Sequence, residues 1–310
     1  MANRYRFNRA SRAGKHLFIA ILSCGIMILT AASWADDKPS SGQGDLAKAS
    51  QNPISSLISV PFEFNNTFNN GPEDAYALNL NIKPVIPMSI TKKWNLVNRL
   101  TIPVIYQSEK FTGQGLIGPI QTTFKTEVVS PGQTNTGSEF GFGDITYQGF
   151  FIQKKSGKYI WGIGPQVGFP TGMGRLTTNH FSAGPAAVAL TMPGHWVIGL
   201  VASNAWSVGE GYNNPPDVNS FSAQYFINLN FKGGWYLATA PLITANWEAE
   251  NSDDIWTVPF GFGGGRVFKI GKQPVNLKLV GYYSAIRPDE ASDWNLQFTW
   301  NILFPPKPNK

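Results

Sequence analysis

The sequence predicts an all-β protein, a transmembrane antiparallel β-barrel of about 12 strands with short periplasmic turns and longer external loops. Three observations support this class: segments of about ten residues alternate between apolar and polar side chains, their connections alternate in length, and tryptophans gather at segment ends. With 14% charged residues, 32 Gly and 22 Pro, the composition favours strands and turns over helices. A secreted soluble sandwich is the alternative fold.

Residues 1–35 are typical of a secretory signal peptide. Five basic residues precede the apolar run Leu17–Ala32, and Ser33–Ala35 offers a small-x-small cleavage site. A retained anchor and a lipoprotein cleaved before Cys24 are the alternatives. Cleavage removes the only cysteine and most of the excess positive charge, so we expect neither disulfide nor thiol chemistry and no nucleic-acid partner.

The mature chain divides into three parts. Residues 36–53 are polar and form a flexible periplasmic lead-in or a partial plug, 54–305 form the barrel, and 306–310 form a periplasmic tail. The final strand alternates most clearly, and we expect it to close against the first. The expected strands are Leu57–Thr67, Tyr76–Ile86, Trp94–Tyr106, Phe140–Ile152, Tyr159–Phe169, Phe181–Met192, Trp196–Val208, Phe221–Phe231, Trp235–Trp247, Trp256–Phe268, Val275–Tyr283 and Trp294–Phe304.

Charge gives an independent test of this topology. The short turns carry lysines and no acidic residue, whereas most acidic residues fall in or near the long connections, including the loop Gln107–Ser138. Tryptophans directly follow three short turns and occupy the opposite ends of other strands, as two interfacial belts would require. The short turns therefore belong to the periplasmic end.

Prolines inside strands are the feature that a simple barrel does not explain, because proline cannot donate to a strand ladder. We expect bulges or local breaks near them, and a bulge at Gly263–Gly265, since Arg266 otherwise falls on the lipid face. The prolines concerned are Pro61, Pro84, Pro103, Pro165, Pro185, Pro241 and Pro259.

Catalytic chemistry finds little support. An outer-membrane hydrolase needs a nucleophile and a base at the external rim, and His180 is the one histidine predicted there. No nucleophile motif accompanies it, so we predict no enzyme and no catalytic residue. Two mature histidines and no cysteine predict no metal site, and the glycine runs lack the residues of a phosphate loop, so we predict no cofactor.

The lumen is the predicted site. Lys83, Arg99 and Lys278 face inward near the periplasmic turns and could form a basic ring, with Glu63 and Asp144 inward at other heights. The ring could select anionic solutes, or its charges could be internal salt bridges that fill a narrow barrel. The final strand adds further candidates for the lumen wall, Asn295, Gln297, Thr299 and Asn301.

Ordered motifs along most of the chain resemble a Gram-negative outer-membrane transporter-like family. That family is related to the group named after the meta-cleavage pathway of phenol degradation and is often mislabelled neuromedin U. The matching segments are Pro84–Pro87, Trp94–Leu96, Ile102–Tyr106, Phe142–Ile145, Trp161–Pro165, Gly184–Val188, Asn246–Ala249, Trp256–Pro259, Arg266–Leu277, Gly281–Tyr283, Arg287–Pro288, Asp293–Leu296 and Phe304–Pro305. The resemblance implies a barrel with a transport role and supplies no catalytic or ligand residues.

We therefore expect an outer-membrane channel for passive passage of small solutes, with aromatic or hydrophobic compounds suggested by the resemblance. A structural or surface-adhesive barrel with a closed lumen is the alternative. The expected partners are outer-membrane lipid and lipopolysaccharide, the barrel assembly machinery, which would read the terminal aromatic Phe304, and the solute.

Overall fold

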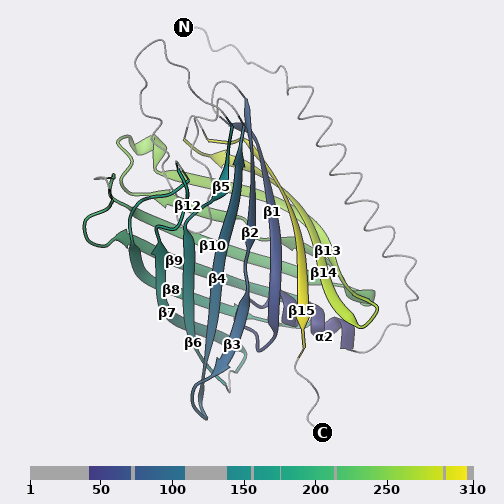
Figure 1. Ribbon diagram of the computed structural model, residues 1–310. Helices are drawn as coiled ribbons and strands as arrows, with labels where there is room; N and C mark the ends of the chain where they lie inside the picture. Colours follow the sequence, from purple (N-terminus) through teal and green to yellow (C-terminus); the bar gives the residue numbers. More distant parts are fainter. Residues whose placement is uncertain are drawn as a thin grey trace.

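A computed structural model describes residues 42–70, 74–108, 138–154, 157–174, 176–212, 215–288 and 291–305. Within these residues the chain forms one closed antiparallel barrel (Figure 1). The predicted signal peptide, the tail 306–310 and most of the loop Gln107–Ser138 lie outside the described residues. No helix in the described segments is long and apolar enough to cross a bilayer.

The barrel has 12 strands, of which three are interrupted, so that 15 strand segments result. The segments are β1 (Ile58–Asn70), β2 (Ala75–Ile82), β3 (Val85–Ser89), β4 (Trp94–Gln107), β5 (Glu139–Phe142), β6 (Ile145–Gln153), β7 (Tyr159–Phe169), β8 (Ser182–Thr191), β9 (Trp196–Ser207), β10 (Asn219–Asn230), β11 (Trp235–Thr239), β12 (Leu242–Asn246), β13 (Trp256–Ile270), β14 (Gln273–Ile286) and β15 (Trp294–Phe304). The predicted closure is confirmed, because β15 pairs with β1 from Ile58↔Phe304 to Phe68↔Trp294.

Two of the seven prolines interrupt their strands: Pro84 separates β2 from β3, and Pro241 separates β11 from β12. A register shift beside Pro259 gives a third irregularity. The third interrupted strand divides into β5 and β6 at Gly143 and Asp144, where no proline is present.

The prediction of a bulge or break was wrong at Pro61, Pro103, Pro165 and Pro185, where the strands run on unbroken. A proline loses its donor but keeps its acceptor: Pro61 O and Pro103 O accept bonds from Lys83 N and Gly143 N at 2.9 and 3.0 Å.

The predicted bulge at Gly263–Gly265 is also absent, because β13 keeps an unbroken register with β14 through all three glycines. Arg266 does lie on the outward side, in step with the exposed Phe260 and Phe262. It is nevertheless only 2% exposed, because it packs against the rings of Trp235 and Phe268 and its Nε donates to Gly233 O at 3.3 Å. The aromatic surroundings and the nearby turn, rather than a bulge, make this position tolerable.

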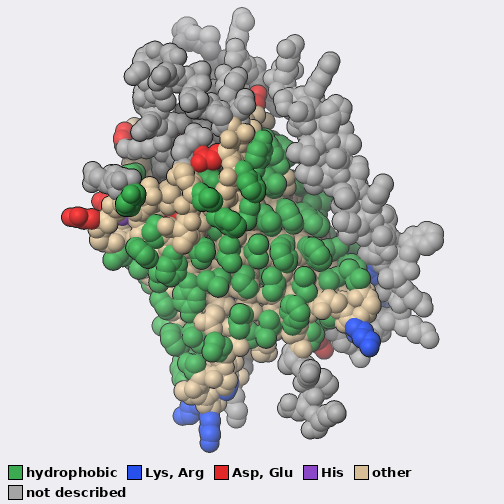
Figure 2. All heavy atoms as spheres, viewed as in Figure 1, with side chains coloured by type: hydrophobic (Ala, Val, Ile, Leu, Met, Phe, Trp, Pro, Cys, Tyr) green, Lys and Arg blue, Asp and Glu red, His purple; other side chains and the backbone are tan. Residues whose placement is uncertain are grey.

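The outer wall is apolar between two ends of opposite charge. Figure 2 shows hydrophobic side chains covering the wall, with acidic side chains near one end and Lys or Arg at the other. Aromatic clusters mark the acidic end: Trp247 and Trp256 lie edge to face at 5.4 Å, and the rings of Tyr283 and Trp294 are 4.8 Å apart. Such a band and its aromatic girdle are the signature of a barrel in a bilayer.

Among the described residues, one α-helix is present: α2 (Gly42–Gln51), which lies at the short-turn end of the barrel (Figure 1). Asp45 in its first turn and Lys48 in its last turn suit the helix dipole, but ten residues form only a marginal helix alone. Packing supplies the rest, because Ala47 is 1% exposed and contacts residues of the inner wall.

Candidate solute site in the barrel lumen

Strand alternation decides which side chains reach the lumen. On β1 and β15 the odd-numbered residues face inward, and on β14 the even-numbered residues do, in agreement with their burial. The structure therefore places all the residues predicted to line the lumen on the inner wall of the barrel or at its external end. They do not all take part in one site.

Glu63 and Lys83 form an ion pair inside the lumen. Lys83 Nζ donates to Glu63 Oε1 at 2.6 Å, and Asn65 Nδ2 donates to the same oxygen at 3.3 Å. The expectation that Glu63 lies at another height than the basic residues was wrong. The register between β1 and β2, which alternation alone does not reveal, pairs Glu63 with Asn81, so that Lys83 is its diagonal neighbour on the inner face.

Lys278 belongs to the same charged layer. Thr299 is paired with Glu63 on one side and with Lys278 on the other, so a single residue separates the two charges along the wall. Lys278 does not border the central space and lies behind the Glu63–Lys83 pair.

Arg99 stands apart from this pair, on the inner face of β4. Its Nη1 is buried and has no hydrogen-bond partner among the described residues. Its guanidinium carbon is 6.0 Å from the centroid of the Phe150 ring, which lies toward the periplasmic end. Glu63, Lys83, Arg99 and Lys278 are called the charged layer below; three cations there face one carboxylate.

The polar residues of the last strand lie beside the charged layer. Gln297 Nε2 and Asn295 Nδ2 donate to Asn65 Oδ1 at 3.0 and 3.5 Å. Thr299 and Asn301 are buried inward, and Thr299 Oγ1 and Asn301 Oδ1 find no partner within the described part of the chain. Only Asn295 and Gln297 of the four border the central space.

Asp144 is committed to a loop instead of the lumen. Its carboxylate accepts bonds from Thr178 N and Thr178 Oγ1, both at 2.7 Å, and from Gly172 N at 2.9 Å. His180, the residue considered for hydrolysis, is 4% exposed and its Nε2 contacts Pro215 O at 3.2 Å. Both residues therefore tie the loop between β7 and β8 to its surroundings. In the described segments no three His, Cys, Asp or Glu side chains gather as a metal site would require.

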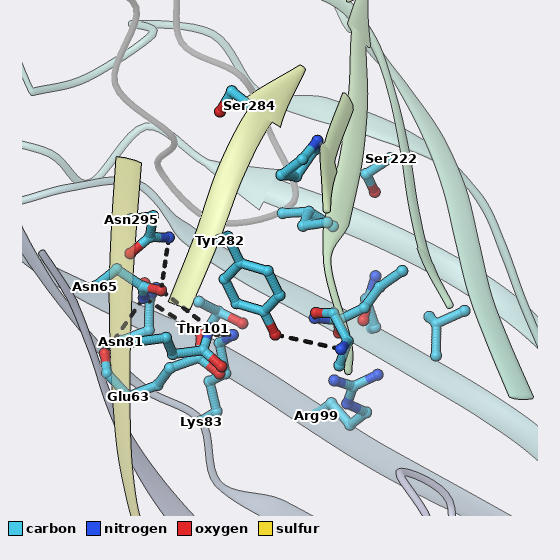
Figure 3. Close-up of a pocket in the computed structure, with 17 residues that line it drawn as sticks. Glu63, Asn65, Asn81, Lys83, Arg99, Thr101, Ser222, Tyr282, Ser284 and Asn295 are labelled. Carbon is cyan, nitrogen blue, oxygen red and sulfur yellow. Dashed lines mark hydrogen bonds and ion pairs between the residues drawn. The ribbon is translucent and has the colours of Figure 1, made fainter. Parts of the chain in front are cut away.

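Sequence reasoning missed most of the residues around the central space, although the same alternation would have found them. Figure 3 shows the Tyr282 ring between Arg99 and the Glu63–Lys83 pair, with its hydroxyl bonded to Ala240 N at 3.2 Å. The missed polar residues are Gln148, Ser222, Gln224, Tyr282 and Ser284, whereas Asn65, Asn81 and Thr101 were expected on the polar inner faces of their strands. Apolar residues complete the lining: Val201, Ala240, Leu242 and Pro259.

The segment 42–57 packs against the inner wall on the periplasmic side of this space. Ile54 joins buried side chains from β3, β4, β6, β8, β9 and β10, among them Val97 and Phe150. Ala47 and Leu57 join Tyr236, Ala238, Val267 and Leu303 from β11, β13 and β15. The segment therefore contacts two different parts of the inner wall, one formed by β3 to β10 and the other by β11, β13 and β15.

Four polar contacts fix the same segment. Gln51 and Asn230 exchange two amide hydrogen bonds at 2.8 and 3.0 Å, and Lys48 Nζ donates to Gly194 O at 2.6 Å. Asn276 Nδ2 donates to Ser50 Oγ at 3.3 Å. These contacts join the segment to strands and to a short turn at the periplasmic end.

Comparison with known proteins agrees with this architecture. A sequence profile of the family described as putative MetA-pathway of phenol degradation matches residues 88–273. An outer membrane channel from Pseudomonas putida F1 superposes with a TM-score of 0.55 at 16% identity, covering 80% of this chain and 94% of that one. The NanC porin gives 0.45 at 8% identity, covering 80% and 100% of the two chains. The CymD monoaromatic hydrocarbon channel gives 0.38 at 9% identity, covering 85% and 92%. No curated protein matches the sequence.

Proposed function

Since the chain belongs to the family described as putative MetA-pathway of phenol degradation, we propose that it is an outer-membrane channel for passive passage of small solutes, aromatic or hydrophobic ones among them. The observation that carries the proposal is the lumen itself. Polar side chains and an excess of positive charge surround a central space, whereas a purely structural barrel would gain more from an apolar filling. The Pseudomonas putida F1 protein of the same fold is described as an outer membrane channel, which agrees with this function.

The segment 42–57 acts in this proposal as a plug at the periplasmic mouth. Burial of an aliphatic side chain such as Ile54 or Leu57 contributes roughly 1.5–3 kcal/mol. Together with the four polar contacts of α2, this is enough to hold the plug in place at rest. A solute passes only when the segment moves, so the plug sets the fraction of time that the channel is open.

Conductance in planar bilayers tests both claims, that the barrel is a channel and that the segment 42–57 restricts it. We expect the mature protein to give small or infrequent openings, and deletion of residues 36–51 to give a larger, steady conductance. Deletion of residues 36–41 alone, which spares α2, is the control and behaves as the mature protein does. If neither the mature protein nor the long deletion conducts ions or swells solute-loaded liposomes, the lumen is closed and the barrel has a structural or adhesive role.

The route to the membrane completes the proposal. Signal peptidase would cleave after Ala35, and the assembly machinery would read the aromatic end of β15. N-terminal sequencing of the protein from outer-membrane fractions tests the cleavage, with Asp36 expected first. The acidic external rim would meet lipopolysaccharide through bridging divalent cations.

A further inference from the structure

We propose that the lumen holds a binding site for small carboxylates with an apolar or aromatic body, in which Arg99 binds the carboxylate. This inference rests on the proposed channel function and narrows its solute class. It starts from the contrast between two cations in the same space, of which one is neutralised and the other is not.

Lys83 is already satisfied. Its ammonium group contacts Glu63 at 2.6 Å, and Glu63 is the one acidic residue among those that line the space. Glu63 is therefore bonded to Lys83 and not to Arg99. Lys278 lies behind this pair and does not border the space.

Arg99 is left with unmet hydrogen-bonding capacity. Its buried Nη1 has no partner among the described residues, and a buried donor without a partner costs free energy that a ligand can restore. A guanidinium presents parallel N–H groups that match the two oxygens of a carboxylate. Arg99 and Gln148 are paired across β4 and β6, and Gln148 in turn donates to Gln166 Oε1 at 2.6 Å, which fixes the wall beside the guanidinium.

Part of the lining suits an apolar body. Val201, Ala240, Leu242 and Pro259 border the space, and the Tyr282 ring stands between Arg99 and the Glu63–Lys83 pair (Figure 3). Because the Tyr282 hydroxyl already accepts a bond from Ala240 N, the ring is positioned to stack rather than free to rotate.

Equilibrium binding to the detergent-solubilised mature protein tests the site without requiring transport. The probes are benzoate and benzyl alcohol, which share the ring but differ in charge. We expect benzoate to bind at least tenfold more tightly. Arg99→Gln should weaken benzoate binding about tenfold or more and leave benzyl alcohol unchanged, and Arg99→Lys should fall between, because it keeps the charge without the paired donors. Lys92→Gln, which removes one exposed charge from a periplasmic turn, is the matched control.

Heat-modifiable migration in gels confirms that each variant is folded. Equal affinities for the two probes, or benzoate binding that survives Arg99→Gln in a folded variant, overturn the site. If Arg99→Gln does not fold, the comparison of the two probes on the unaltered protein decides. Benzoate binding without any conductance or flux would overturn the channel function and keep the site, whereas flux without preference for benzoate would do the reverse.

Discussion

Lys83 Nζ lies 2.6 Å from Glu63 Oε1 inside the lumen, and Thr299 alone separates Glu63 from Lys278 along the wall. The pair keeps the only carboxylate of the central space neutralised, so the layer as a whole is positive. Removing the charge of Glu63 and removing the charge of Lys83 should therefore change ion selectivity in opposite directions.

Glu63→Gln removes the neutralising carboxylate and should make the open channel more selective for anions. Lys83→Gln leaves the carboxylate and should make the channel more selective for cations, because a charged ring in a narrow lumen sets selectivity. The selectivity of each variant is measured from the zero-current potential in a salt gradient, with residues 36–51 deleted. Glu248→Gln, at the exposed external end, is the control and should change little. Shifts of the same sign for Glu63→Gln and Lys83→Gln would show that the layer does not control the ion path.

Ala47→Trp should open the channel. Ala47 is 1% exposed against Tyr236 and Val267, and a ring at that position has no room, so α2 must leave the wall. Asp45→Trp places the same side chain at an exposed position of the same helix. We expect a severalfold increase in mean conductance for Ala47→Trp alone. Equal conductance of the two variants would mean that α2 does not restrict the mouth.

Gly164→Ala should impair folding of the barrel. A Cβ at Gly164 would overlap the backbone carbonyl of Gly149 in the neighbouring strand. Because a backbone atom cannot move aside as a side chain can, β6 and β7 would have to separate. Gly281→Ala meets no atom within 4 Å and is the matched control. We expect a loss of about 2 kcal/mol or more for Gly164→Ala, comparable to overpacking a core, and less than about 0.5 kcal/mol for Gly281→Ala. Urea unfolding in detergent micelles measures the difference.

Trp235 and Arg266 face each other across β11 and β13, with the guanidinium carbon 4.9 Å from the ring centroid. A double-mutant cycle of Trp235→Leu and Arg266→Gln should give a coupling of about 0.5–2 kcal/mol in unfolding free energy. Trp196, which also follows a short turn, replaces Trp235 in the control cycle and should show no coupling with Arg266. A coupling near zero would mean that the Trp235 ring does not help to hold Arg266, which also contacts Phe268 and Gly233.

Alternation along the chain was enough to predict the strands and their faces. The limits of β7 and β15 were predicted to the residue, and the short turns fell where lysines and tryptophans indicated. The alternation of side chains along a strand reveals its limits and its two faces, because this alternation depends only on residues that are neighbours in the sequence. The proline positions were harder: the carbonyls of Pro61, Pro84 and Pro103 all accept bonds, at 2.9, 3.1 and 3.0 Å, yet of these three only Pro84 interrupts its strand.

The sequence by itself determined that Glu63, Lys83, Arg99 and Lys278 face the lumen, and that residues 36–310 contain two histidines and no cysteine. Only the tertiary structure decided that Lys83 is bonded to Glu63, that Arg99 Nη1 has no such partner in the described part, and that residues 42–57 pack inside the mouth. The physical reason is that a strand's period fixes the face of each side chain, whereas its height depends on registers set by partners far along the chain.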